Sequence, residues 1–231
     1  LTASLKTDQA SGRFDYELSD TLSFFAQGSF ARTQNANTFA PMTILSKTIS
    51  ASNPYLPQSA RNIMAAAGTT SFTLSRFVDD VEPSITRATA RNYNGSAGLS
   101  GKVGTFDWEA SYTFGRSRQT VYNINNVNNG KLAAALDTVQ SGGQIVCRVS
   151  VTNPGLYPGC VPLNPFGAGS ITAEAADYVR DDTRFTLTNT THDFNAFVSG
   201  SPFDTWAGPV KIALSGEYRK LKLENDSSAQ P

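Results

Sequence analysis

Cys147 and Cys160 are the two cysteines of the chain and the residues best suited to form a covalent cross-link. The segment between them contains the turn-forming pairs Pro154-Gly155 and Pro158-Gly159 and no histidine or carboxylate. A metal ion would need further ligands nearby. The spacing therefore favours a disulfide in a loop over two free thiols or a metal site. Such a disulfide would place the loop outside the cytosol.

Glu217 and Arg219 stand two residues apart in a predicted strand, so their side chains point to the same face. We expect a structural ion pair with neighbouring strands at this position. Motifs of hydrolases and zinc proteases are missing, and the single histidine, His192, lies at a predicted strand start. The sequence thus predicts no enzyme, no cofactor and no metal.

The overall composition narrows the class of protein. The chain has 231 residues, 19 basic and 19 acidic side chains, and only 16% charged residues, against roughly 25% in an ordinary soluble domain. Without a basic excess it is not expected to bind nucleic acid. No apolar run approaches the roughly 18 residues of a transmembrane helix. Membrane-spanning strands are compatible with this composition, because only alternate residues need to be apolar.

Apolar and polar residues alternate in three long stretches, and period-two alternation is typical of β-strands. Phe14, Tyr16 and Leu18, for example, are separated by charged residues. The pattern predicts hairpins near 12–32, 86–114 and 185–223, with turns at Ser19-Asp20, Gly101 to Gly104 and Gly200 to Gly208. The aromatic residues on the apolar side would face lipid or form an interfacial girdle: Phe14, Tyr16, Phe24, Phe106, Trp108, Tyr112, Phe114 and Tyr218.

Two long connections, 33–85 and 115–184, separate the hairpins, and short helices are predicted within them near 60–68, 131–139 and 173–179. Short turns at one end and long loops at the other are typical of outer-membrane barrels. A soluble β-sandwich also alternates, but its strands are usually shorter. Periodicity therefore favours the barrel and leaves the sandwich open. Tyr55, Arg61, Arg76, Tyr122, Tyr157 and Phe166 could line a loop surface. None is assigned to ligand binding.

Several segments resemble the barrel portion of TonB-dependent outer-membrane receptors. These are Asn53-Pro54-Tyr55-Leu56-Pro57, Gly115-Arg116, the run from Ala135 to Val139, Gly143 to Arg148, Gly159 to Gly167, and the strand from Ala207 through Gly216-Glu217-Tyr218-Arg219. The two-cysteine loop ending in Val161-Pro162-Leu163-Asn164 and the strand ending in Arg219 carry the most weight.

The resemblance implies an antiparallel, all-β, up-and-down transmembrane β-barrel segment with about six strands and long extracellular loops that carry short helices. It implies energy-coupled nutrient uptake in a bacterial outer membrane. The partners would be lipid, the remainder of the barrel with its plug, and the periplasmic coupling protein TonB. Glu217 and Arg219 would face the lumen of such a barrel, either as a structural ion pair with neighbouring strands or in contact with the plug. Because no plug is visible and plugged transporters have roughly 22 strands, we expect a fragment, residues 1–231 being part of one barrel domain. The alternatives are a passive porin, a small outer-membrane barrel, or a secreted β-sandwich binding module.

Overall fold

The computed structural model describes residues 3–38, 41–79 and 81–228. It divides into two compact units that interleave along the chain. The loop unit is built chiefly from Asn37–Thr86 and Tyr122–Thr183. The sheet unit is built from Ser4–Ala36, Arg87–Val121 and the chain from Arg184 onward.

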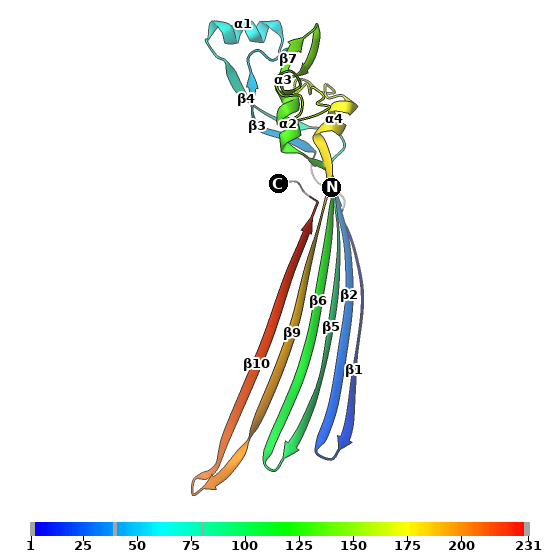
Figure 1. The fold of residues 1–231 in the computed structure, drawn as a ribbon, viewed down its shortest axis with the longest axis vertical. Helices are drawn as coiled ribbons and strands as arrows, with labels where there is room; N and C mark the ends of the chain where they lie inside the picture. Colours follow the sequence, from blue (N-terminus) through cyan, green and yellow to red (C-terminus); the bar gives the residue numbers. More distant parts are fainter. Residues whose placement is uncertain (1–2, 39–40, 80, 229–231) are drawn as a thin grey trace. The chain divides into compact units, whose positions relative to one another are not determined.

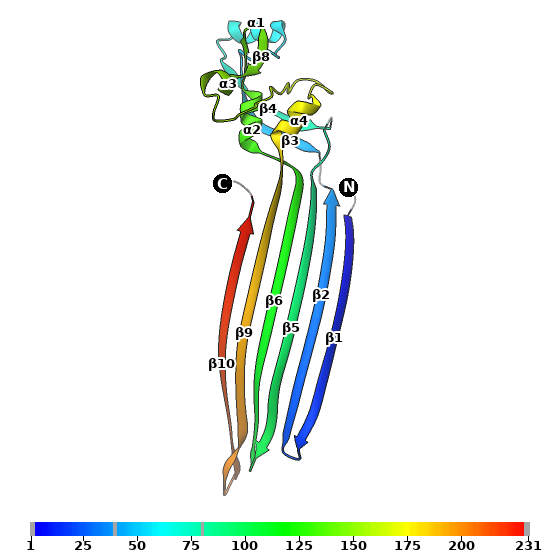
Figure 2. The same ribbon diagram turned by 45° about the vertical axis from the view of Figure 1, so that its right-hand side comes forward.

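A single six-stranded sheet forms the sheet unit. Its strands follow the sequence order β1 (Ala3–Ser19), β2 (Leu22–Thr38), β5 (Ile85–Val103), β6 (Phe106–Val127), β9 (Arg180–Thr205) and β10 (Gly208–Ser227). Neighbouring strands run in opposite directions (Figure 1), and a second view shows the same order (Figure 2). Strands β1 and β10 are the two edges, and the sheet does not close within the described residues. The predicted all-β antiparallel class is therefore confirmed, whereas a closed barrel is not observed.

Strand pairing keeps the alternating pattern in register. In the β9–β10 pair, Tyr218 lies opposite Phe194 and Gly216 lies opposite Ala196, so apolar residues share one face. A bulge between Val210 and Ile212 shifts this register near the turn.

Strands of the sheet extend beyond the predicted hairpins 12–32, 86–114 and 185–223, because strand pairing continues into more polar sequence. Strand β6 extends to Val127 and β9 begins at Arg180, inside the predicted loop 115–184. The third turn was predicted from Gly200 to Gly208, but β9 continues through Thr205 and the turn is Trp206-Ala207. His192 lies well inside β9, and not at its start.

The loop unit contains two small sheets and four helices. Its elements are β3 (Met42–Ser50), α1 (Gln58–Ala66), β4 (Ser71–Val78), α2 (Asn129–Leu136), β7 (Thr138–Ser141), β8 (Gln144–Cys147), α3 (Arg148–Thr152) and α4 (Ala173–Val179). Helices α1, α2 and α4 correspond to the three predicted helices. Its buried core includes Ile44, Val78, Leu132, Leu163 and Val179. Both long connections thus contribute to one folded unit.

Candidate functional site: two faces of the six-stranded sheet

One face of the sheet carries aromatic residues on every strand, and we call this surface the apolar band; it includes Phe14, Phe24, Tyr93, Tyr112, Phe194 and Tyr218. Its ring contacts run from strand to strand: Phe14 lies 6.4 Å from Phe24, and Phe194 lies 4.6 Å from Tyr112 and 6.4 Å from Tyr218, between ring centroids. Such cross-strand aromatic pairs stabilise a sheet. Exposure remains high, with 58% of Phe14 and 64% of Tyr218 accessible. A large exposed apolar face of this kind marks an interaction surface.

The predicted aromatic residues share this face. Phe106 lies against Gly200 of β9 and Trp108 lies against Gly101 of β5, because a Cβ atom at either glycine would touch the ring. These rings cover the two glycines and compensate for their missing side chains. The same face also holds Phe30, Tyr93 and Phe194, which the predicted girdle did not include, together with His192.

Small residues make a shallow depression in the apolar band. It spans β5, β6, β9 and β10 and is lined by Ala97, Ala110, Ala196 and Gly216, with Phe24, Tyr112, Phe194 and Tyr218 around it. The lining is chiefly apolar. A flexible hydrocarbon chain is the type of ligand that such a surface accommodates.

The opposite face is polar, and Asp193 is the centre of its strongest network. Arg219 reaches this carboxylate at 2.8 Å and also contacts Glu217 at 2.6 Å. Asn195 donates a second hydrogen bond to Asp193 at 2.8 Å. Asp193 is only 8% exposed, and a buried carboxylate needs such donors to offset its lost hydration. Glu217 and Arg219 therefore pair, with Asp193 as a third member that the sequence did not reveal.

A second polar network lies on the same face at the other side of the sheet. Arg13 contacts Asp15 at 2.7 Å, lies over the ring of Phe25 at 5.5 Å and is 3.4 Å from the amide oxygen of Gln27. Glu109 of β6 also attracts its charge. The two faces of one sheet thus differ sharply in polarity, which follows from the period of two in the strand sequences.

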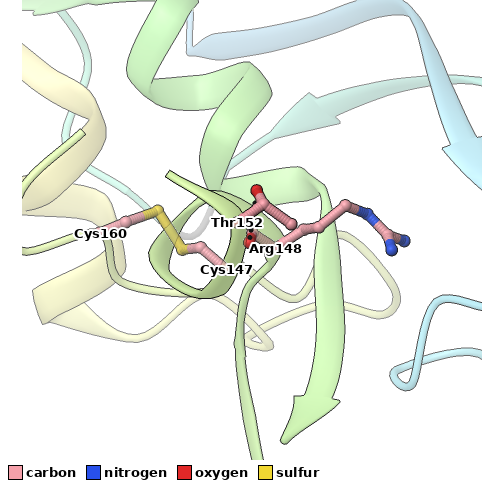
Figure 3. The surroundings of a disulfide bond; sticks show 4 residues. All are labelled: Cys147, Arg148, Thr152 and Cys160. Atoms are coloured by element: carbon pink, nitrogen blue, oxygen red, sulfur yellow. Dashed lines mark hydrogen bonds between the residues drawn. A yellow bond between two sulfur atoms is a disulfide. The ribbon is translucent and has the colours of Figure 1, made fainter. Parts of the chain in front are cut away.

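The disulfide Cys147–Cys160 closes a loop in the loop unit, as predicted. The S–S distance is 2.07 Å and the Cα atoms lie 6.1 Å apart. Figure 3 shows that Cys147 directly precedes Arg148 at the start of α3, where the Thr152 hydroxyl donates to the Arg148 carbonyl at 3.1 Å. Cys147 is fully buried. The bond therefore fixes the start of α3 to the Pro- and Gly-rich segment that follows it.

Asp181 connects the start of β9 to helix α2. The Lys131 ammonium group donates a hydrogen bond to the Asp181 carboxylate at 2.6 Å. The side-chain amide of Asn128 donates a second hydrogen bond to the same carboxylate at 2.8 Å. Burial raises the pKa of the Asp181 carboxyl, but the hydrogen bonds from Lys131 and Asn128 outweigh burial and leave the pKa below its ordinary value. Asn128 also caps α2 by accepting from the Lys131 backbone N–H at 3.0 Å. This network fixes the orientation of α2.

The loop residues considered for a binding surface are used in different places. Arg76 donates to the Pro165 carbonyl at 3.1 Å, and Phe166 packs on Phe72 at 6.3 Å. Gly130 leaves no space for a side chain beside the hydroxyl of Tyr157. Such contacts belong to internal packing of the loop unit, and they do not gather these residues into one site.

In residues 3–38, 41–79 and 81–228, no group of three or more His, Cys, Asp or Glu residues is arranged to hold a metal ion. Within the same ranges no helix combines the length and apolar character needed to cross a membrane. The sequence matches no known family model and no curated protein.

Proposed function

We propose that this chain forms part of an outer-membrane β-barrel receptor of the TonB-dependent type, which takes up a nutrient by energy coupling. The observation that carries the barrel part is the contrast between the apolar band on one face and the Arg219–Asp193 network on the other. A membrane barrel needs an apolar outer face and tolerates a polar lumen. In this proposal the apolar band faces lipid, and Glu217 and Arg219 face the lumen.

The two sheet edges support a larger barrel. Strands β1 and β10 each have one neighbour in the sheet. Unpaired backbone groups are too costly in hydrocarbon, so in a membrane both edges need partner strands. We propose that the remainder of the barrel supplies these strands and surrounds a plug.

The turns and connections support an orientation. The tight turns Asp20-Thr21 and Trp206-Ala207 lie at the same end of the sheet (Figure 1), and the two long connections leave from the opposite strand ends. Outer-membrane barrels have short periplasmic turns and long extracellular loops. The Cys147–Cys160 bond is consistent with loops outside the cytosol. The loop unit would then face the exterior, where a nutrient is captured.

The receptor part of the proposal rests on the family resemblance, above all on the two-cysteine loop and on Gly216-Glu217-Tyr218-Arg219. A passive porin would share the two-faced sheet but not the plug and coupling region. A β-sandwich would cover its apolar face with a second sheet. In the described residues the other two sheets have only two strands each, whereas a sandwich pairs two larger sheets.

Fractionation of the source cells tests this function. We expect the native protein in the outer-membrane fraction, extracted only by detergent, with a plug-like domain found by peptide mapping beyond the present sequence. Uptake of its nutrient should stop when the coupling protein is deleted. A native protein that is soluble without detergent would contradict the barrel, and uptake that persists without the coupling protein would favour the porin.

A further inference from the structure

Three arginines lie side by side on the same face as the apolar band. They are Arg32 on β2, Arg91 on β5 and Arg118 on β6, and we call them the arginine row. These strands are consecutive neighbours in the sheet. All three residues belong to the sheet unit.

The β2–β5 register places the first two arginines opposite each other. The rings of Phe30 and Tyr93 are 5.0 Å apart across these strands. Arg32 is two residues after Phe30, and Arg91 is two residues before Tyr93. Because the strands are antiparallel and side chains alternate, the two arginines occupy the next position on the same face.

The β5–β6 register extends the row to its third member. Two hydrogen bonds join these strands, one on each side of the row: Thr113 to Ser96 at 3.1 Å and Thr86 to Asn123 at 2.7 Å. Both correspond to the same register, so no residue is inserted between them. Counting from either bond puts Arg118 directly opposite Arg91.

Like charges opposite each other destabilise a sheet unless something compensates them. In residues 3–38, 41–79 and 81–228, none of the three arginines forms an ion pair. Asp8 of β1 lies opposite Arg32 in the register set by the Thr7–Thr33 and Arg13–Gln27 contacts, and it also contacts Lys6 at 3.8 Å. Glu224 contacts Lys222 at 2.7 Å, and Arg116 attracts its charge as well. Nε of Arg32 is buried without a hydrogen-bond partner. Asp8, itself in contact with Lys6, offsets the row only in part, so the three arginines keep an excess of positive charge.

The row lies just beyond the aromatic residues of the apolar band. At roughly 3.3 Å per residue, Arg32 is about 7 Å along the strand from Phe30. Arg116, two residues before Arg118, adds a cation between the row and the ring of Phe114. In a membrane barrel, aromatic girdles mark the interface. Cations immediately beyond them are at the level of lipid headgroups.

We propose that the arginine row binds the phosphate of a membrane-lipid headgroup, with the lipid's acyl chains against the apolar band. This inference rests on the proposed function, because it needs lipid around the sheet. Guanidinium groups form bidentate, charge-assisted hydrogen bonds to phosphate, so one or two phosphates would neutralise the row. The depression lined by Ala97 and Ala110 lies on the same face and has room for a chain. A free phosphate ion would use the arginines but not this apolar surface.

The experiment compares lipid binding by two triple variants of the native protein in non-ionic detergent. The test variant is Arg32→Gln/Arg91→Gln/Arg118→Gln, and the control with the same charge change is Lys47→Gln/Lys102→Gln/Lys211→Gln. Native mass spectrometry measures binding of phosphatidic acid, with phosphatidylcholine and free glycerol phosphate as comparison ligands. Each arginine should contribute about a fivefold gain in affinity, so we expect the test variant to bind phosphatidic acid roughly a hundredfold more weakly than wild type. The control should bind as wild type does.

Stability without lipid provides the second measurement. Removing the repulsion should leave the test variant at least as thermostable as wild type in lipid-free detergent, and phosphatidic acid should stabilise only wild type and the control. Equal binding by all three proteins, glycerol phosphate binding as tight as phosphatidic acid, or a test variant that unfolds more readily without lipid would each overturn the inference. In those cases a detergent-dependent protein still supports the barrel. A protein soluble without detergent would overturn both.

Discussion

Asn53 in the first long connection donates a hydrogen bond from its side-chain amide to the carbonyl oxygen of Leu136, the last residue of α2 in the second connection, at 3.1 Å. Its own side-chain oxygen accepts from the Tyr55 backbone N–H at 3.0 Å. Asn53 is 1% exposed. One side chain thus shapes a turn in one connection and satisfies a helix C-terminus in the other.

Replacing this residue should destabilise the loop unit. We expect Asn53→Ala to cost about 2 kcal/mol in the free energy of unfolding, because it removes the hydrogen bonds to the buried Leu136 carbonyl and to the partly buried Tyr55 N–H. Chemical unfolding monitored at the loop unit would measure this. Asn62→Ala is the control, since Asn62 accepts only from Gln58 on the exposed side of α1; a similar loss in both variants would contradict the role of Asn53.

The disulfide should stabilise the loop unit because the cross-link restricts the conformations of the unfolded chain. A loop of this size corresponds to about 3 kcal/mol in the chain-entropy model. We expect the Cys147→Ala/Cys160→Ala variant to unfold at lower denaturant concentration, and a reducing agent to affect wild type alone. Thiol titration of the denatured, unreduced protein should find no free thiol. Two reactive thiols there would contradict the bond.

The Asp181 network should make the loop unit sensitive to acid. The pKa of this carboxyl is lower in the folded protein than its ordinary value of 3.8, so its ionised form stabilises the fold. This contribution is fully present above pH 3.8. It disappears as the pH falls through the lower pKa of the folded state.

Unfolding midpoints measured between neutral pH and about pH 2 test this pH dependence. Protonation of Asp181 accounts for part of the stability that wild type loses in acid. The Asp181→Asn variant should not show this part of the loss. Lys131→Gln should reduce it, because it removes both a hydrogen bond and a positive charge while burial of Asp181 remains. Identical pH profiles of stability for wild type and Asp181→Asn would show that protonation of Asp181 does not affect folding.

The Arg219–Asp193 pair should contribute more than an exposed ion pair. Arg219→Met removes the charged donor of the buried Asp193 carboxylate and leaves the hydrogen bond from Asn195, so we expect a lower unfolding midpoint in detergent. Adding Asp193→Asn should restore part of the loss by removing the uncompensated charge. Lys102→Met, which breaks an exposed contact to Asp107 at 3.4 Å, is the control and should change little. Equal effects of the two single variants would contradict this view.

The strands of the sheet could be predicted because alternation is a local signal. Phe14 to Leu18 and Trp108 to Phe114 each show a period of two, and the ring contacts of these strands agree with it. Strand ends could not be located in the same way. Where β6 continues from Gly115 to Thr120 the apolar–polar alternation is lost, and backbone pairing with neighbouring strands decides the length of the strand.

The loop unit was predicted only in part. The Gly142-Gly143 pair between β7 and β8 is a hairpin signal that the sequence analysis missed; both glycines have positive φ, 58° and 82°, as a two-residue hairpin turn requires. Asn53 and Asp193 gave no local signal at all. Their roles depend on contacts with Leu136 and Arg219, which are remote in the sequence.

Lipid exposure of the apolar band is the central claim, and one pair of neighbouring residues tests it most directly. Ala110 lies in the apolar depression and Ser111 alternates with it on β6, towards the polar face. The measurement is the free energy of folding of the native protein into lipid bilayers, with arginine at either position. We expect Ala110→Arg to cost about 2–4 kcal/mol, as for a charge at the bilayer midplane, and Ser111→Arg to cost much less. Equal costs at the two positions, or no cost at Ala110, would contradict a lipid-facing sheet.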